Sequence, residues 1–431
     1  MSNRLQITAA APDPALLTLP WHIPLEEWPD EVLAALPRGI SRHVVRFVRL
    51  SGRVIAVKEI GESVAHREYE LLRQLSRIDV PSVEPVGVIT GRRSRDGEEL
   101  NSVLITEHLQ FSLPYRALFS QYLRPDTATR LIDALAVLLV RLHLNGFYWG
   151  DVSLSNTLFR RDAGAFAAYL VDAETGDLHQ HLSDGQRAYD LEIARVNVIG
   201  ELMDLEAGEI LDSTVDTLTV GEMLVVRYEE LWQELTVSEW FEPGEMWRVQ
   251  SRISRLNHLG FDVGELDMST DVDGTRIRIQ PKVVDAGHHH RRLMRLTGLD
   301  VQENQARRLL NDMDAYRAAT ERQGEEEEFV AHDWLRTIFE PAIRAVPREL
   351  RGKLEPAEIF HELLEHRWYR SQEAEQDLPL IDVVPDYVDH VLRHRPDEKA
   401  VLGLDTATLR AISDDVEDEP ADVDAGNPLL G

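Results

Sequence analysis

A polar loop between an apolar helix and two short apolar strands is the feature that most constrains the fold. The helix begins at Pro125, carries leucines spaced by four, three and four residues, and closes near Gly146; this spacing is helical. The loop 149–156 holds an Asp and an Asn five positions apart. The strand that completes this unit ends at Asp172, sixteen residues beyond Asn156. One tight hairpin spans that length, so we expect Asp172 to return beside Asn156.

The residue types at these positions suit phosphate chemistry. In the pattern D-x-x-x-x-N, here Asp151 to Asn156, a carboxylate lies beside a substrate hydroxyl and an amide oxygen faces a metal. Asp172, once beside Asn156, would let both residues hold Mg²⁺ between nucleotide phosphates. Each motif is weak alone. An Asx-rich loop without chemistry is the commoner interpretation of residues 151–156 taken by themselves.

The preceding segment predicts a small antiparallel sheet with one inserted helix. Apolar strands flank a Ser51-Gly52 turn between residues 40 and 60, a helix covers 62–77, and further strands follow at 83–89 and 103–106. Alternating apolar residues around a two-residue turn of this kind indicate a hairpin. The predicted fold class is therefore α+β.

Candidate nucleotide-binding residues lie on this sheet and its helix. Gly39 and Ser41 are the small residues at the start of the hairpin, where backbone N–H groups can approach phosphates, and Lys58 on the next strand can reach them. Glu68 shares a helical stripe with three apolar residues. It therefore faces the sheet, and a carboxylate there needs a partner such as Lys58. The alternatives are an ordinary hairpin and a partly exposed Glu68.

Three further features have open roles. Asp190 opens a helix from about 188 to 205, either as its cap or as a brace beneath the loop. A basic cluster at 288–295 could bind an anionic group, although pairing with nearby acidic helices is favoured. His361 and His366 nearly form a zincin pattern. They are five positions apart on a helix and do not share a face, which argues against zinc.

The order and spacing of these motifs resemble the protein-kinase-like superfamily over about residues 35–210. The sequences GFYWGDVSLSN and YLVDAE look most like its compact members: the Kdo/lipopolysaccharide kinases, the RIO kinases and the aminoglycoside phosphotransferases. The resemblance implies a two-lobed, ATP- and Mg²⁺-dependent phosphotransferase acting on a hydroxyl-bearing acceptor. It assigns residues to the site: Lys58 and Glu68 as the ion pair, Asp151 as the catalytic base, Asn156 and Asp172 as metal ligands, Gly39 and Ser41 beside the phosphates, and the backbone from Glu107 to Leu109 as the adenine hinge.

The departures from the superfamily pattern concern the substrate. Trp149-Gly150 replaces the His-Arg before the base, Ser153 replaces a lysine, and Ala173-Glu174 replaces Phe-Gly. These changes argue against a protein kinase with an activation loop. They also favour a second hypothesis, a nucleotide-binding pseudokinase that acts as a regulator or scaffold and binds a protein partner through its second domain. Retention of Lys58, Asp151, Asn156 and Asp172 opposes it.

Four segments are predicted along the chain: a flexible N-terminus at 1–18, the kinase-like domain at 19–215, a mainly α-helical domain at 216–410, and a disordered acidic tail at 411–431. The helical domain contains one predicted β-hairpin, with Asp273-Gly274 as its turn. It resembles a bacterial, mainly actinobacterial, domain of unknown function, and that resemblance carries no chemistry.

Composition narrows the class of partners. The chain has 46 Lys and Arg against 76 Asp and Glu, a formal charge of −30. Such a surface repels phosphate backbones and anionic membranes, so nucleic acid is not an expected partner. The chain has no cysteine, which excludes disulfides and thiol catalysis. Its longest apolar run, 134–140, is too short to cross a bilayer. Since no signal peptide is recognisable, we expect a cytoplasmic protein.

Overall fold

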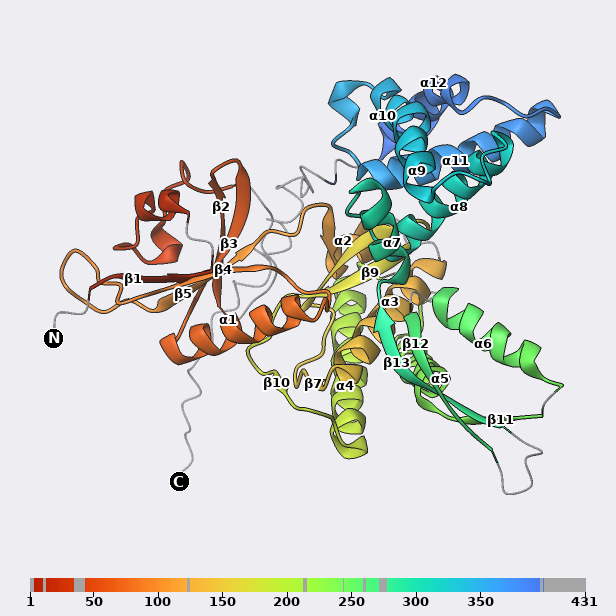
Figure 1. Ribbon diagram of the computed structural model, residues 1–431. Helices are drawn as coiled ribbons and strands as arrows, with labels where there is room; N and C mark the ends of the chain where they lie inside the picture. Colours follow the sequence, from red (N-terminus) through yellow and green to blue (C-terminus); the bar gives the residue numbers. More distant parts are fainter. Residues whose placement is uncertain are drawn as a thin grey trace, which may run out of the picture.

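The computed structural model describes residues 4–10, 13–34, 43–121, 125–211, 215–242, 244–258, 261–270, 277–395 and 398. It has a small β-rich lobe, a larger mixed lobe, and a helical C-terminal part that lies against the larger lobe (Figure 1). The predicted fold class is confirmed. Gly39, Ser41 and the turn at Asp273-Gly274 lie outside the described residues.

The small lobe is a five-stranded antiparallel sheet with one long helix. The strand order is β1-β4-β5-β3-β2. Alternation along β3 sends Ile55 and Val57 to one face and Lys58 to the other, toward α1. The elements are β1 (Gln6–Ala9), β2 (Val44–Leu50), β3 (Arg53–Ile60), α1 (Glu62–Arg77), β4 (Pro85–Thr90) and β5 (Ser102–Glu107).

The described part of the first 18 residues, which the sequence predicts to be flexible, forms a strand and a short helix. Strand β1 pairs with β4 at the edge of the sheet. The short helices η1 (Pro14–Thr18) and η2 (Leu25–Glu27) follow, and Leu16, Trp21 and Trp28 pack on the sheet face opposite α1. Without this cover the face that carries Ile55 would be open to water, so burial of apolar surface orders the segment.

The larger lobe is built around the apolar helix α3, whose leucine stripe is buried as predicted. A three-stranded sheet with the order β6-β8-β9 and a two-stranded sheet of β7 and β10 pack beside it. The elements are β6 (Ser112–Pro114), α2 (Tyr115–Gln121), α3 (Pro125–Leu144), β7 (Phe147–Tyr148), β8 (Thr157–Asp162), β9 (Ala165–Leu170), β10 (Asp177–Leu178) and α4 (Asp184–Ala207).

The predicted domain boundary at 215/216 does not follow the hydrophobic cores. Helix α5 (Thr217–Thr236) packs on α3 and α4, and its buried residues belong to the core of the larger lobe, which extends to Phe261. The apolar face of α5 has nowhere else to be buried in the described structure. The elements that follow are β11 (Glu239–Phe241), α6 (Met246–His258), β12 (Phe261–Thr270) and β13 (Ile277–Ala286).

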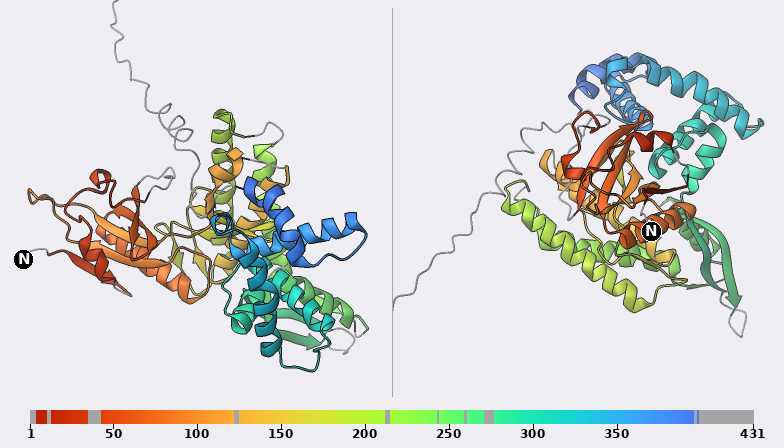
Figure 2. Two further views of the ribbon diagram at one scale, coloured as in Figure 1. Left: turned by 90° about the horizontal axis from the view of Figure 1, so that it is seen from above. Right: turned by 90° about the vertical axis from the view of Figure 1, so that its left-hand side faces the viewer.

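A second core begins at Leu293 and holds the C-terminal helices together. The basic helix α7, which the sequence analysis missed, is flanked by Gly287 and Gly298, both with positive φ. The elements are α7 (His288–Thr297), α8 (Glu303–Ala319), α9 (Glu327–Trp334), a π-helical turn η3 (Leu335–Phe339), α10 (Glu340–Ala345), η4 (Arg348–Leu350), α11 (Pro356–Ala374), α12 (Leu380–His390) and η5 (Leu392–His394). Figure 2 shows them on one side of the larger lobe.

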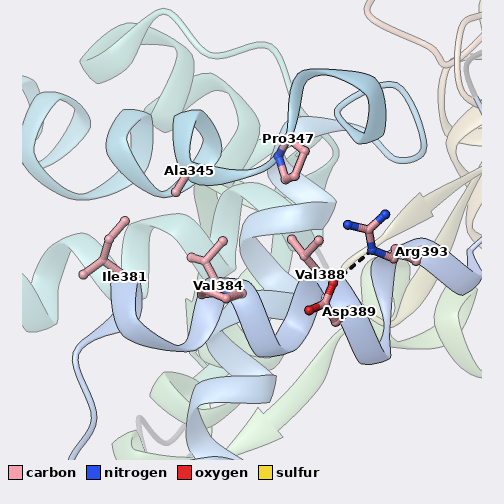
Figure 3. A pocket seen from close by; sticks show the side chains of 8 residues that line it. Ala345, Pro347, Ile381, Val384, Val388, Asp389 and Arg393 are labelled. Carbon is pink, nitrogen blue, oxygen red and sulfur yellow. Dashed lines mark hydrogen bonds and ion pairs between the residues drawn. The ribbon is translucent and has the colours of Figure 1, made fainter.

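Two sequence features of this part, the basic cluster at 288–295 and the pair of His361 and His366, make structural contacts. In the basic cluster, Arg292 pairs with Glu327, and the first turn of α7 donates to Glu303, as the favoured interpretation predicts. His366 pairs with Asp386 rather than with His361. An apolar groove of about 240 Å³ lies between α10 and α12 and is edged by the ion pair of Asp389 with Arg393 (Figure 3). Among the described helices none is both long and apolar enough to cross a bilayer.

Candidate active site

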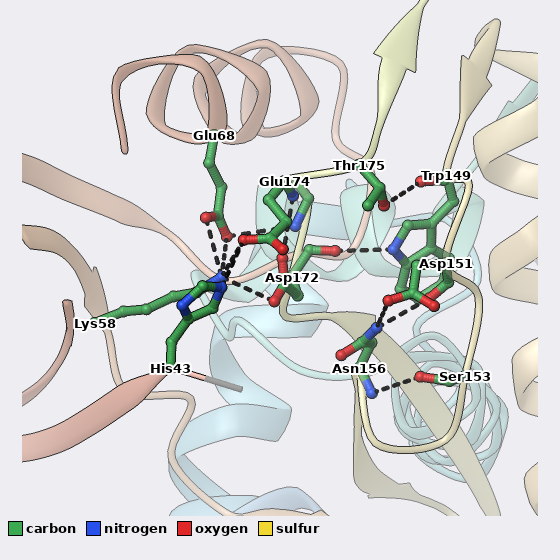
Figure 4. Close-up of polar contacts among 11 residues, drawn as sticks. His43, Lys58, Glu68, Trp149, Asp151, Ser153, Asn156, Asp172, Glu174 and Thr175 are labelled. Atoms are coloured by element: carbon green, nitrogen blue, oxygen red, sulfur yellow. Dashed lines mark hydrogen bonds and ion pairs between the residues drawn. The ribbon is translucent and has the colours of Figure 1, made fainter. Parts of the chain in front are cut away.

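Lys58 lies at the centre of a charged cluster where the two lobes meet (Figure 4). Its Nζ is 2.8 Å from Asp172 Oδ2, 3.1 Å from Glu68 Oε2 and 3.4 Å from Glu174 Oε2. The predicted ion pair between strand β3 and helix α1 is therefore present. Glu174 also contacts His43 at 3.1 Å, which links the start of β2 to the larger lobe.

Burial governs the protonation of this cluster. Glu68 is 1% exposed, and its burial raises its pKa to about 7 against the opposing charge of Lys58. Burial alone would lower the pKa of Lys58, but the carboxylates of Glu68, Asp172 and Glu174 outweigh it and raise that pKa. Lys58 is therefore a cation at neutral pH.

The loop 149–156 is held from below by one stripe of polar residues on α4. Asp190 accepts hydrogen bonds from the backbone N–H groups of Trp149 and Gly150, both at 2.8 Å. Asn197 donates to the Val152 carbonyl, and Glu201 accepts from the backbone N–H groups of Leu154 and Ser155 at 2.7 and 2.9 Å. Asp190 is thus the brace and not the helix cap, which is Ser183.

Asn197 and Glu201 were not predicted, although a sequence signal for them exists. They lie seven and eleven positions after Asp190, so the three residues share one face of the helix. Gly150 adds a second constraint because its φ is +79° and an added Cβ would lie 3.1 Å from the Tyr148 ring. The turn between Trp149 and Asp151 therefore favours glycine at this position.

Asp151 and Asn156 face each other across this loop, as Figure 4 shows. The side-chain amide of Asn156 donates to the Asp151 carbonyl at 3.0 Å and to its carboxylate at 3.2 Å. Its amide oxygen is turned away from Asp151. Asn197 also lies 3.4 Å from the Asp151 carboxylate.

The hairpin of β8 and β9 brings Asp172 back beside Asn156, as its length predicts. The Val171 N–H donates to the Asn156 carbonyl at 3.0 Å, and the Trp149 indole donates to the Asp172 carbonyl at 2.8 Å. The carboxylates of Glu68, Asp172 and Glu174 lie within 4.8 Å of one another and could hold a metal ion. All of these donors are oxygens, which is the donor set that Mg²⁺ prefers. Sequence reasoning named Glu174 only as a departure from Phe-Gly.

The predicted adenine hinge is the connection between the two lobes. Glu107 ends β5 and pairs with Arg53 at 2.8 Å. The Leu109 carbonyl accepts from the Ser112 hydroxyl at 2.7 Å, where β6 begins. Burial lowers the pKa of the intervening His108 to about 4, so its ring is neutral. The role of this segment in binding adenine stays a prediction.

Loss of the Asp190 brace should destabilise the chain. Asp190→Ala leaves two backbone N–H groups, one buried and one partly buried, without an acceptor. Each such group costs about 1–3 kcal/mol, so we expect a loss of about 2–6 kcal/mol. Urea unfolding of the full chain measures this. Asp184→Ala, at an exposed position on the same helix, is the control. Equal midpoints for the two variants would contradict the role of Asp190.

A buried histidine attached to the brace predicts a pH effect on stability. His143 contacts Asp190 at 3.1 Å and the Tyr228 hydroxyl at 2.7 Å. Burial lowers its pKa below the ordinary 6.5, although Asp190 opposes the shift. Below about pH 6.5 the unfolded chain then takes up the proton first, so the free energy of unfolding falls as the pH falls. We expect wild type to lose more stability than His143→Gln between pH 7.5 and 5.5. Parallel pH profiles would contradict this.

Two protein families match parts of the chain. Residues 49–196 match the lipopolysaccharide kinase (Kdo/WaaP) family, and residues 230–392 match a domain of unknown function, DUF4032. No curated protein matches the chain. Among solved structures, "WaaP in complex with acyl carrier protein" is 17% identical, with a TM-score of 0.35, over 53% of this chain and 89% of that one. Residues 49–196 are thus similar to the lipopolysaccharide kinase family, and residues 230–392 are similar to the domain of unknown function.

Proposed function

We propose that the chain is an ATP- and Mg²⁺-dependent phosphotransferase that transfers the terminal phosphoryl group of ATP to a hydroxyl acceptor. The position of Lys58 carries this proposal. Its Nζ lies between Glu68 on helix α1 and Asp172 at the end of the β8–β9 hairpin, which is the arrangement that places a lysine on nucleotide phosphates beside a metal-binding aspartate. The match to a kinase family supports the same class of reaction.

Each site residue then has one task. Lys58, held by Glu68, binds phosphate oxygens, and the Glu107–Leu109 backbone holds the adenine. Asp151 orients the acceptor hydroxyl and takes its proton. The backbone around Gly39 and Ser41 would cover the phosphates.

Asn156 and Asp172 are the residues proposed to hold Mg²⁺. Asn156 turns its amide oxygen away from Asp151, and Asp172 presents its carboxylate beside Lys58. When bound, the metal would offset the negative charge of the phosphates.

The charge of the Lys58 cluster predicts that ATP binding depends on Mg²⁺. Three carboxylates surround one lysine, so the net charge of these four groups is negative even when Glu68 is protonated. An anionic cluster repels nucleotide phosphates. We therefore expect ATP to bind weakly without Mg²⁺ and tightly with it.

The test uses the purified full chain in two measurements. Calorimetric titration with ATP, with and without MgCl₂, measures binding. Transfer of label from [γ-³²P]ATP to fractions of a cell extract measures turnover and separates acceptor compounds from water. Mg²⁺-dependent binding with transfer supports the proposal. Absence of ATP binding in both conditions would contradict it.

Binding without turnover is the result that favours the pseudokinase hypothesis. The replacement of Phe-Gly by Ala173-Glu174 supports that hypothesis, because Glu174 lies 3.4 Å from Lys58 and could keep it from the phosphates. Glu174→Ala discriminates between the two. If the chain is a pseudokinase, Glu174→Ala should raise ATP affinity without creating turnover. Measurable turnover by the wild-type chain excludes the pseudokinase.

A further inference from the structure

The tip of the β8–β9 hairpin is held by the C-terminal helices. Asp162, 2% exposed, accepts from the Gln305 backbone N–H at 2.8 Å and from the Asn304 side-chain amide at 2.9 Å. Both donors lie in the first turn of α8, where a negative charge is stabilised. The Ala163 N–H donates to Glu358 of α11 at 2.9 Å. The Gln305 side chain joins these contacts, since its amide donates to Glu358 at 2.9 Å.

Side chains along the hairpin make further contacts with the C-terminal part of the chain. We call these contacts, together with those of the tip, the junction. Arg160 pairs with Glu355 at the start of α11, and Arg161 pairs with Glu398 at 2.7 Å. The Tyr169 hydroxyl donates to Gln302 at 2.7 Å. Glu398 is buried, so it depends on its arginine: a buried charge left without its partner is strongly destabilising. The junction is therefore built from paired polar groups that specify one position of the hairpin.

The base of the same hairpin is the proposed metal site. Asn156 immediately precedes β8, and Asp172 lies two residues beyond β9. The strands are in register from Thr157 with Leu170 to Asp162 with Ala165. At about 3.3 Å per residue the tip lies roughly 17 Å from the base. A displacement of the tip is therefore transmitted to both proposed ligands.

We infer that the C-terminal domain positions the metal ligands of the kinase-like lobe through this hairpin, with Asp162, Gln305 and Glu358 as positioning residues. A binding site needs its ligands held within about 0.5 Å. The junction supplies this order. The inference rests on the proposed function for the identity of the ligands Asn156 and Asp172.

The test measures metal affinity and stability separately in the full chain. Mn²⁺ binding is followed by electron paramagnetic resonance with a non-hydrolysable ATP analogue, and thermal unfolding gives the melting temperature. Mutations in a packed connection between two separated sites typically change the coupling by an amount that corresponds to about 2–30-fold in affinity. We expect Asp162→Ala to weaken Mn²⁺ binding by about 2–30-fold, and Asp162→Asn to retain most of the affinity because its amide oxygen can still accept from Gln305.

Asp312→Ala is the matched control. Asp312 lies on α8 as well, and accepts from the Trp334 indole at 2.8 Å inside the C-terminal domain. This variant should lower the melting temperature without changing Mn²⁺ affinity. If Asp162→Ala does not fold, Gln305→Ala takes its place. Wild-type Mn²⁺ affinity in a folded junction variant would overturn the inference.

Hydrogen exchange separates failure of the inference from failure of the proposed function. If wild type binds no Mn²⁺–nucleotide, the proposed function fails, and the positioning role is then measured on the backbone. Faster exchange at 151–156 and 170–174 in Asp162→Ala, but not in Asp312→Ala, supports the inference. Equal exchange in the two variants overturns it.

Discussion

Lys58→Met is expected to lower phosphoryl-transfer turnover by about 10²–10³-fold, the typical effect of removing one preorganised group that stabilises developing charge. Lys58 contacts Glu68, Asp172 and Glu174 within 3.4 Å. Methionine keeps most of the side-chain volume but leaves three carboxylates around the phosphate position with no cation. ATP affinity should therefore fall together with turnover. Labelled-ATP transfer and calorimetric titration measure the two effects.

Two matched controls separate charge from folding. Arg73→Met removes the cation of an exposed ion pair with Glu70 on the same lobe, and should leave ATP binding unchanged. Glu70→Gln, on the outer side of α1, should likewise leave ATP binding unchanged. If Lys58→Met binds and turns over ATP like wild type, the nucleotide site does not include Lys58.

The local sequence pattern was sufficient to predict how much of the candidate site is arranged. The predicted helix 62–77 has the observed bounds. Its apolar stripe determines which face of the helix is buried, and that stripe includes Glu68. The pairing of Glu68 with Lys58 follows from burial of a carboxylate next to a strand. The return of Asp172 to Asn156 follows from the length of one hairpin. These inferences need only periodicity and chain length.

Contacts between distant segments could not be predicted in this way. The N-terminal segment around Leu16 and Trp21 has no helical or strand periodicity, and it is ordered by the sheet face it covers. The hydrogen bond from the Gln305 backbone N–H of α8 to Asp162 joins residues that are 143 positions apart. Nothing local in either segment indicates it.

Charged residues were the hardest to place because their surroundings decide their role. Asp190 had two equally plausible roles from sequence. The structure distinguishes them because the two N–H groups that Asp190 accepts from belong to the loop and not to its own helix. Glu174 gave no sequence signal beyond its departure from the superfamily pattern, yet it lies against Lys58 and His43. A side chain four residues beyond a strand end can turn to either side, and only the assembled lobes show which.

The mutation of Asp151 tests the chemistry and not the fold. Asp151 is set apart from the Lys58 cluster: its carboxylate contacts Asn156 and Asn197, which are neutral amides. Nucleotide and metal are proposed to be held by other residues, namely Lys58, Asn156 and Asp172. Removal of the Asp151 charge should therefore separate turnover from binding.

Asp151→Asn is expected to lower turnover by about 10²–10⁴-fold, the range typical of a positioned acid–base group, while ATP affinity changes little. Asparagine keeps the size and one hydrogen-bond acceptor but cannot take the hydroxyl proton. Labelled-ATP transfer to extract fractions gives turnover, and thermal shift with Mg²⁺–ATP gives binding. Asp177→Asn, an exposed residue in β10 beside the same loop, is the control and should keep wild-type turnover. Measurable and equal turnover in wild type and Asp151→Asn would show that another group accepts the proton, because an amide in that position has no basicity to replace the carboxylate.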